Sequence, residues 1–343
     1  MSKPVVVALG VASIAAFGAA LSWLLKSQDS SDERASQRPA GASARKADPS
    51  DERKQADPVL AADASIEEIV SALDANLRTA MLFLPRHGQG AQSTDELSLP
   101  GVLAIRSAAR DSTFNQILCF GKMDAAVAQK AYTFVMTPER PVSWCLSPLG
   151  DVAAWTAQLG EWGITEQERL IAMRYPLPAQ ELPLRMLSGG AGIIRVQSRD
   201  HLSLLCHLWT RCGVDASAFQ YLVSTPLDTI AGESSVVEVY LGVSAANEVL
   251  CSGMLVCSDG VAGLHGLVTA PSKRRQGFGA VMLRKLLSRA KRRGYAQVVV
   301  QAPEEAVRWY TEQGFQPLRF KDALLPASYQ ICRSMHAFGM GLE

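Results

Sequence analysis

The chain has almost no net charge and few aromatic residues. Its 343 residues include 34 Lys and Arg against 33 Asp and Glu, a formal net charge of +1, and aromatic residues make up 7%. Because positive and negative charges are nearly equal in number, the chain as a whole is not attracted to nucleic acid or anionic lipid, and any electrostatic argument must be local. With 48% hydrophobic residues the chain can still bury a large core, and its length predicts two lobes plus appendages.

The sequence also lacks the residue spacing of a metal site. Its seven cysteines form no close C-x-x-C pair and no zinc spacing with the five histidines. The odd count and the apolar settings of Cys251 and Cys257 indicate reduced core residues in a cytosolic protein. We therefore expect no metal ion.

One long apolar run stands out at residues 4–25, between Lys3 and Lys26. Its 22 residues are enough to cross a bilayer as a helix. A cleavable signal peptide is the main alternative, because the small residues at 18–20 resemble a processing site. The apolar run continues past that site, and more Lys and Arg follow it than precede it. We therefore predict a single-pass membrane anchor with the rest of the chain in the cytoplasm.

Residues 26–60 are polar and contain no aromatic side chain. A segment of this composition buries too little apolar area to offset the entropy lost on ordering, which predicts a disordered linker.

From residue 61 the pattern becomes that of a folded protein, with helical and strand signals in alternation up to about residue 181. This order predicts an α/β or α+β lobe. Its isolated His87 and Cys145 are interpreted as structural. The predicted elements are a helix from Ile66, a loop at 88–98, helices at 122–131 and 151–163, and strands at 102–107, 115–120, 132–137, 142–146 and 169–175.

A stretch with Pro, Ser and a Gly-Gly pair, at 182–192, predicts a boundary before a second lobe at 191–334. The pattern there gives the order β-α-α-β-β-β-α-β-α-β-β, with a tight-turn signal at Asp259-Gly260. The predicted strands are 193–197, 236–243, 249–258, one after Gly260, 295–301, 316–320 and 329–334, and the predicted helices are 199–212, 216–223, one from Ala280 and one from Glu304.

The chemistry concentrates in residues 262–280, where an apolar run changes into a basic turn. Arg274, Gly277 and Gly279 spell R-x-x-G-x-G, and from Ala280 the apolar positions recur at helical spacing. The first N–H groups of a helix have no intrahelical partner and carry the positive end of its dipole. Because the glycines remove side chains and Arg274 and Arg275 add charge, the turn predicts an anion site.

Residues 273–293 contain nine Lys or Arg and no acidic residue. Three interpretations stay open. The basic residues form a solvated helix face, or they attract a phosphate-rich cofactor, or, least favoured, they contact nucleic acid.

The turn, followed about thirty residues later by Y-x-x-x-G-F at 310–315, resembles the acetyl-CoA site of the GNAT superfamily of N-acetyltransferases. The resemblance covers about 191–334. It implies an α/β (α+β) fold with a mixed central sheet flanked by helices, here in two lobes after an N-terminal transmembrane helix. The lobe at 61–181 more weakly resembles the degenerate first half of a tandem GNAT protein, with the sheet but without the phosphate turn.

The resemblance implies that acetyl-CoA is the acyl donor. The strand before the turn would pair with the pantetheine arm, the turn amides would hold the pyrophosphate, and the amide of Leu267 or Val268 would polarise the thioester carbonyl. The implied cofactor-binding residues are Leu267, Val268, Thr269, Arg274, Arg275, Gln276, Gly277, Phe278, Gly279 and Ala280.

Tyr310 matches the family tyrosine that protonates the leaving thiolate, although it is equally placed to pack beside Trp309. The asparagine often found seven residues before this tyrosine is replaced by Pro303, a departure from the ribosomal-protein acetylating subtype. His265 is a candidate general base, because histidine titrates near neutral pH. A structural role for His265 stays open. Glu238, Glu304 and a chain of water molecules are the alternative bases.

The resemblance implies an acyl-CoA-dependent N-acyltransferase that moves acetyl to a primary amine by direct attack. An acyl-CoA-binding pseudoenzyme, sensor or interaction module is the alternative. The acceptor is a small-molecule or peptide amine, and nothing in the sequence chooses between them or fixes the oligomeric state.

Overall fold

The computed structural model describes residues 59–87, 94–107, 112, 115–135, 141–183, 191–213, 226–232, 235–321 and 323–334. The predicted anchor at 4–25, nearly all of the predicted linker and the predicted helix at 216–223 lie outside these ranges. None of the described helices combines the length and apolar character that crossing a bilayer requires.

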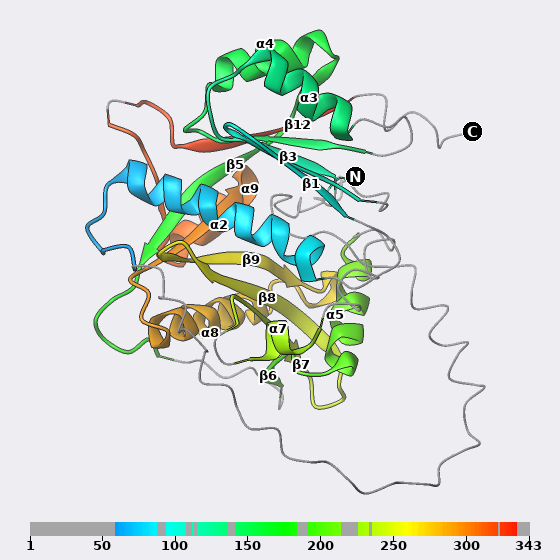
Figure 1. Cartoon of the computed structure of the whole chain (residues 1–343). Helices are drawn as coiled ribbons and strands as arrows, with labels where there is room; N and C mark the ends of the chain where they lie inside the picture. The colour runs from blue at the N-terminus through cyan, green and yellow to red at the C-terminus, as the bar shows by residue number, and fades with distance from the viewer. Residues whose placement is uncertain are drawn as a thin grey trace, which may run out of the picture.

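Strands from both predicted lobes form one mixed, twelve-stranded sheet in the described part of the chain (Figure 1). Along the sheet the order is β1-β2-β3-β4-β12-β5-β10-β9-β8-β7-β6, and β11 pairs with β5. The strands are β1 (Asp95–Leu99), β2 (Val102–Arg106), β3 (Gln116–Cys119), β4 (Ser143–Leu146), β5 (Ile164–Pro176), β6 (Gly192–Arg195), β7 (Val237–Val243), β8 (Val249–Ser258), β9 (Val261–Thr269), β10 (Gln297–Pro303), β11 (Gln316–Pro317) and β12 (Ser328–Ser334).

Helices cover both faces of the sheet. The apolar side chains of one face pack with α3, α4, α8 and α9, and those of the other face pack with α2 and α5. In Figure 1, α2 lies between the strands of the two predicted lobes, so one helix covers the middle of the sheet. The helices are α2 (Ile66–His87), α3 (Ala125–Val135), α4 (Val152–Glu161), α5 (Arg199–Arg211), α7 (Asp228–Ala231), α8 (Phe278–Arg292) and α9 (Glu304–Glu312), with a short 3-10 turn at Pro271–Lys273.

The two predicted lobes exchange their last strands. β5, the last strand before the predicted boundary, lies between β12 and β10, and β12 lies between β4 and β5. Each lobe also contains one parallel pair joined by a helix, β3-α3-β4 in the first and β9-α8-β10 in the second. Each lobe therefore completes the sheet of the other. The division into 61–181 and 191–334 stays a prediction.

Some predicted elements differ from the structure. The strand predicted at 132–137 is wrong, because α3 continues to Val135 and buries Ala128, Ala131 and Val135 at helical spacing. The loop predicted at 88–98 contains most of β1. α2 extends to His87, β5 begins five residues before the predicted 169, and β11 has only two residues.

The local sequence explains why α2 starts where it does. Ser65 and Glu68 form a capping box, in which the Ser65 N–H donates to Glu68 Oε2 (2.8 Å) and the Glu68 N–H donates to Ser65 Oγ (3.2 Å). Further along, the Asn76 amide donates to the Val256 carbonyl oxygen (2.9 Å). These contacts fix α2 against β8.

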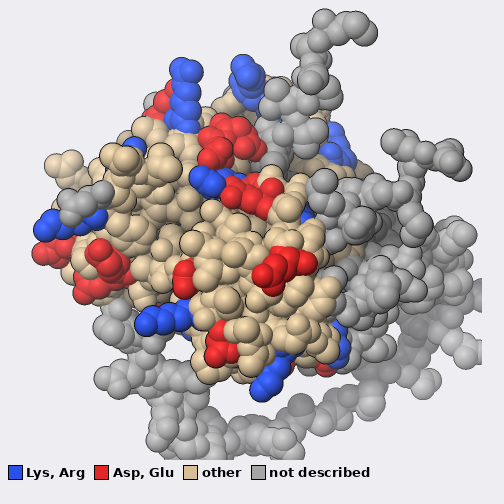
Figure 2. Space-filling model, turned by 90° about the horizontal axis from the view of Figure 1, so that it is seen from above, with Lys and Arg blue, Asp and Glu red and all other residues tan. Residues whose placement is uncertain are grey.

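The charged side chains are dispersed on the face seen in Figure 2, which looks down on the molecule from the α4 side of Figure 1. Acidic and basic groups lie in small separate clusters on a mostly uncharged surface. Within the described part of this face there is no broad basic surface of the kind that binds nucleic acid.

Candidate acyl-CoA site

The candidate site lies where the parallel strands β9 and β10 separate. They pair only at Ala262 with Val298 and at Gly263 with Val299. Beyond these positions β9 stays with β8, while β10 stays with β5 and leads into α9. A cavity of about 470 Å³ lies at this separation. Its lining consists of Leu267, Val268, Thr269, Lys273, Arg274, Arg275, Gly277, Phe278, Gly279, Ala280, Glu305, Ala306, Trp309 and Tyr310.

A bulge in β9 shapes one wall of this cavity. The register with β8 shifts so that no β8 residue pairs with Gly266 or Leu267. Gly266 has a φ of +53° and packs so close to Trp209 that an added Cβ would lie 3.0 Å from its ring. The position therefore requires glycine. The consequence is that Leu267 lines the cavity without a partner residue in the β8–β9 ladder.

The basic turn forms the second wall. Two of its residues have positive φ, Arg275 at 61° and Gly277 at 85°, and Gly277 caps α8 without any side-chain hydrogen bond. The first bond of the helix runs from the Val281 N–H to the Gly277 carbonyl oxygen (3.1 Å). The N–H groups of Phe278 and Gly279 therefore precede the helical ladder and have no intrahelical acceptor.

The glycines of the turn leave room for a ligand. A Cβ added to Gly277 would meet nothing within 4 Å, whereas one added to Gly279 would lie 3.2 Å from Thr269 Oγ1. Successive N–H groups in a turn with left-handed residues, at a helix N-terminus, form a concave anion site. The residues present therefore fit the pyrophosphate of a CoA thioester.

The cations of the turn differ in their partners. Lys273 Nζ lies 2.8 Å from Glu248 Oε2, and Arg274 Nε donates to the Thr269 carbonyl oxygen (3.4 Å). Within the described residues Arg275 makes neither a hydrogen bond nor an ion pair. Arg275 is therefore the turn cation available to a phosphate. Gln276 donates instead to the Ser272 carbonyl oxygen and does not line the cavity.

Tyr310 reaches the same cavity from α9. Its ring is buried, 7% exposed, and packs edge-on against Trp309 and Phe315. Burial raises the pKa of Tyr310, so its hydroxyl stays protonated at neutral pH. No described residue forms a hydrogen bond with this hydroxyl. Tyr310 can therefore donate a proton to a group in the cavity, as its predicted role requires.

Sequence reasoning missed three cavity residues on the same helix, Glu305, Ala306 and Trp309. They lie five, four and one residues before Tyr310 along α9. The i, i+4 spacing pairs Glu305 with Trp309 and Ala306 with Tyr310 on one side of the helix. That spacing was a usable signal once Tyr310 had been singled out.

His265 lies away from this cavity. It is 5% exposed, and its Nε2 is 3.1 Å from Asn76 Oδ1 on α2, which covers the other face of the sheet. Burial lowers the pKa of His265 to about 4, so the ring is neutral at physiological pH. The position of His265 gives the predicted base role no support.

The two alternative bases are also outside the cavity. Glu238 is fully buried in an ion-pair cluster, with Arg289 at 2.7 Å and Arg293 at 2.9 Å. Burial opposes its ionisation, but hydrogen bonds from Arg289 and Tyr240 hold the pKa of Glu238 below its usual value. Glu304 is exposed and does not line the cavity, whereas its neighbour Glu305 does.

In the first half of the chain, the predicted lobe 61–181, the equivalent position is the N-terminus of α3 beside the parallel strands β3 and β4, and it is closed to an anion. β3 and β4 pair at four positions from Gln116 with Ser143 to Cys119 with Leu146, so these strands do not separate. At the start of α3 the Val127 N–H donates to Asp124 Oδ1 (2.9 Å). A carboxylate of the chain itself therefore occupies the helix N-terminus where a phosphate would bind.

The cysteines do not extend this chemistry. All seven are free thiols, and burial raises the pKa of each of them. Among the described residues, no group of three or more His, Cys, Asp and Glu is arranged to hold a metal ion.

A comparison with models of protein families finds a match over the residues of this site. The profile of the family described as "Acetyltransferase (GNAT) domain" matches residues 237–317, which include the strand separation, the basic turn and Tyr310. Residues 237–317 are therefore similar to the acetyltransferase domains of the GNAT family. No curated protein sequence matches the chain.

Solved structures show how far the GNAT fold extends. A GCN5-related N-acetyltransferase from Kribbella flavida is 17% identical and covers 81% of this chain and 96% of its own, with a TM-score of 0.53. One from Sphaerobacter thermophilus is 12% identical, covering 80% and 94%, with a TM-score of 0.48. A tandem GNAT protein from the clavulanic acid biosynthesis pathway is 10% identical, covering 81% and 97%, with a TM-score of 0.47. The Kribbella likeness shows that the mixed sheet with flanking helices is a GNAT-like fold.

Proposed function

We propose that this protein is an acyl-CoA-dependent N-acyltransferase that moves an acetyl group from acetyl-CoA to a primary amine. The observation that supports it best is that three features line one cavity: the N-terminus of α8 without a side-chain cap, Arg275, which has no partner among the described residues, and the protonated Tyr310. These groups meet two needs of the reaction, which are a cradle for the donor phosphates and an acid for the leaving thiolate.

The proposed orientation of the donor rests on the cavity lining. The pyrophosphate binds the N–H groups of Phe278 and Gly279 and the Arg275 guanidinium. The pantetheine arm extends along β9, where the register with β8 shifts, and the amide of Leu267 or Val268 polarises the thioester carbonyl. In this orientation the pantetheine arm leads away from the turn, and the thioester sulfur at its end lies near Tyr310.

The transfer itself is a direct attack. The neutral amine attacks the thioester carbonyl, a C–N bond forms and the C–S bond breaks. Tyr310 gives its proton to the departing thiolate. The proton lost by the amine passes to Glu305, the carboxylate of the cavity lining, or to water beside it.

An acyl-CoA-binding module without turnover is the second candidate. The observation that favours it is that the cavity lining contains no histidine and that its carboxylate, Glu305, is solvent-exposed.

Titration calorimetry of the full chain with acetyl-CoA, followed by mass spectrometry after incubation with an amine panel and a cell extract, separates the two. Binding with an acetylated product supports the enzyme, and binding without any product supports the module. Absence of binding would refute both. The same product identifies the acceptor as a small-molecule or peptide amine.

We also propose that residues 4–25 anchor the protein in the membrane with the enzyme on the cytoplasmic side. The support is the uncharged run and the excess of Lys and Arg after it. A tag after Glu343 should resist protease in sealed cells and stay with the membrane after a salt wash. Extracellular cleavage of the tag, or a mature chain starting near Leu21, would refute the anchor.

A further inference from the structure

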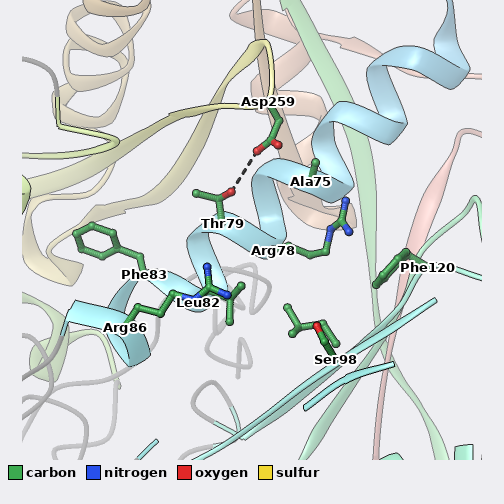
Figure 3. A pocket seen from close by; sticks show the side chains of 10 residues that line it. Ala75, Arg78, Thr79, Leu82, Phe83, Arg86, Ser98, Phe120 and Asp259 are labelled. Carbon is green, nitrogen blue, oxygen red and sulfur yellow. Dashed lines mark hydrogen bonds between the residues drawn. The ribbon is translucent and has the colours of Figure 1, made fainter. Parts of the chain in front are cut away.

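A second cavity, of about 360 Å³, lies between α2 and the strands of the first half. One stripe of α2 forms its floor, with residues recurring at helical spacing, and the other walls come from β1, β2, the end of β3 and the turn between β8 and β9 (Figure 3). Its lining consists of Ala75, Arg78, Thr79, Leu82, Phe83, Arg86, Ser98, Leu103, Phe120 and Asp259.

This cavity is separate from the acyl-CoA site. The two share no lining residue. Asp259 precedes β9, whereas the donor cavity begins at Leu267, and Val261 and Leu267 alone lie about 20 Å apart along an extended strand. A ligand here is out of reach of the thioester. The inference therefore does not depend on the proposed function.

Arg78 is the charge of the second cavity that has no partner within ion-pair distance among the described residues, although its positive charge opposes the rise in the pKa of Asp74 that burial causes. Its guanidinium lies over the Phe120 ring, 4.5 Å from the ring centre, and Figure 3 shows the side chain extending from α2 toward that ring. Among the described residues it makes no hydrogen bond and no ion pair. The neighbouring acid, Asp74, is buried and accepts hydrogen bonds from Ser147 Oγ and the Tyr329 hydroxyl, both at 2.6 Å. The donors of Arg78 therefore remain available to an anion.

Arg86 lines the same cavity two turns further along α2 but, unlike Arg78, has a carboxylate partner. Its Nε and Nη2 donate to the two carboxylate oxygens of Glu96 at 3.2 and 3.1 Å. The charge of Arg86 is thus neutralised within the protein. Asp259, which accepts from Thr79 Oγ1 at 3.1 Å (dashed in Figure 3), adds one negative charge to the lining.

These charges restrict the ligand. One available guanidinium binds one carboxylate well, because its fork of N–H groups matches the two carboxylate oxygens. The Asp259 carboxylate disfavours a dianion such as phosphate. The remaining lining is mixed: Leu82, Phe83 and Leu103 are among its apolar residues and suit a compact hydrocarbon group, while Thr79 and Ser98 add hydroxyls. We propose that this cavity binds a small monocarboxylate with an apolar body, whose carboxylate is held by Arg78.

The test is titration calorimetry of the full chain with 4-methylpentanoate as the probe, alone and with saturating acetyl-CoA. We expect saturable binding that acetyl-CoA does not block. Arg78→Gln should weaken it tenfold or more, Arg78→Lys should weaken it less, and the matched control Arg86→Gln should change it by less than threefold. 4-Methylpentanol and inorganic phosphate should each bind at least tenfold more weakly than the probe.

Thermal unfolding and acetyl-CoA binding of each variant show whether it is folded. If Arg78→Gln fails to fold, Ala75→Leu, which fills the floor of the cavity, replaces it and should also abolish binding. Absence of saturable binding to the wild-type chain, competition by acetyl-CoA, an equal response of the Arg78 and Arg86 variants, or phosphate binding as tight as the probe would each overturn the proposal.

Discussion

A carboxylate placed at Gly277 tests the phosphate cradle directly. The structure shows that a Cβ at this position would meet nothing within 4 Å, so a side chain here extends into the space assigned to the pyrophosphate. In Gly277→Asp the new charge would lie about 4 Å from a phosphate oxygen. At an effective dielectric constant near 20, two like charges at that distance repel by roughly 4 kcal/mol. This energy corresponds to a loss of about a thousandfold in acetyl-CoA affinity.

The backbone contributes a second effect that must be separated from the charge. Gly277 has a φ of +85°, and a side chain in this left-handed region costs about 1–2 kcal/mol. Gly277→Asn is the matched control, because its side chain has the same shape and the same backbone cost but no charge. Both variants should therefore lose similar thermal stability, and only the Asp variant should lose most of its affinity.

Calorimetry with acetyl-CoA at low and high salt measures the difference. We expect the gap between the Asp and Asn variants to narrow as salt rises, because screening weakens the repulsion. If the folded Asp variant bound acetyl-CoA as tightly as the Asn variant, no phosphate would lie at this turn and the assignment of the cavity would be refuted.

Three further results are expected. Tyr310→Phe should leave the dissociation constant of acetyl-CoA within about threefold of wild type and lower kcat by 10²-fold or more, because only the proton donor is removed; unchanged single-turnover rates would exclude this role. Glu238→Gln should lower the free energy of unfolding by about 3 kcal/mol, since Arg289 and Arg293 would lose their buried carboxylate; denaturant titration measures it, and a neutral effect would contradict the reasoning. Burial raises the pKa of Asp74 to about 6, so the folded protein binds this proton more tightly than the unfolded chain does. Protonated Asp74 therefore stabilises the fold fully below pH about 4, and this stabilisation of about 2–3 kcal/mol is lost as the pH rises through 6. In Asp74→Asn the free energy of unfolding should depend less on pH over this range.

The basic turn could be predicted from the sequence because its signal is local. Arg275 and Gly277 adopt their positive φ within a few residues of the helix they start, and the amides of α8 follow from the helix geometry alone. The same holds for Tyr310, since the Y-x-x-x-G-F pattern fixes where α9 ends. Most of the residues predicted to bind the cofactor therefore line one cavity, although their roles stay predictions.

The sequence could not show on which face of the sheet a strand residue lies. His265 and Leu267 are two residues apart, which in a regular strand places both on one face. The bulge at Gly266 breaks this alternation, and it packs against Trp209 of a helix distant in sequence. His265 therefore packs against α2 while Leu267 lines the cavity.

The strand wrongly predicted at 132–137 shows a competition between two signals. Tyr132, Phe134 and Val135 favour a strand by their side chains. Burial of Ala128, Ala131 and Val135 on one side favours a helix, and the helix wins because that stripe packs on the sheet. β1 was missed for the opposite reason, since its short sequence DELSL has only two apolar residues at its alternate positions.

The exchange of strands between the halves explains why the first half persists without a phosphate turn. β5 pairs with β10 over seven residues, from Leu170 to Pro176, and thereby covers the open edge that β10 would otherwise present beside the donor cavity. The same half closes the N-terminus of α3 with Asp124, so this helix has no phosphate site to maintain. One contribution of this half is therefore structural support of the β10 edge, which requires the sheet and α2 but none of the residues that bind a phosphate.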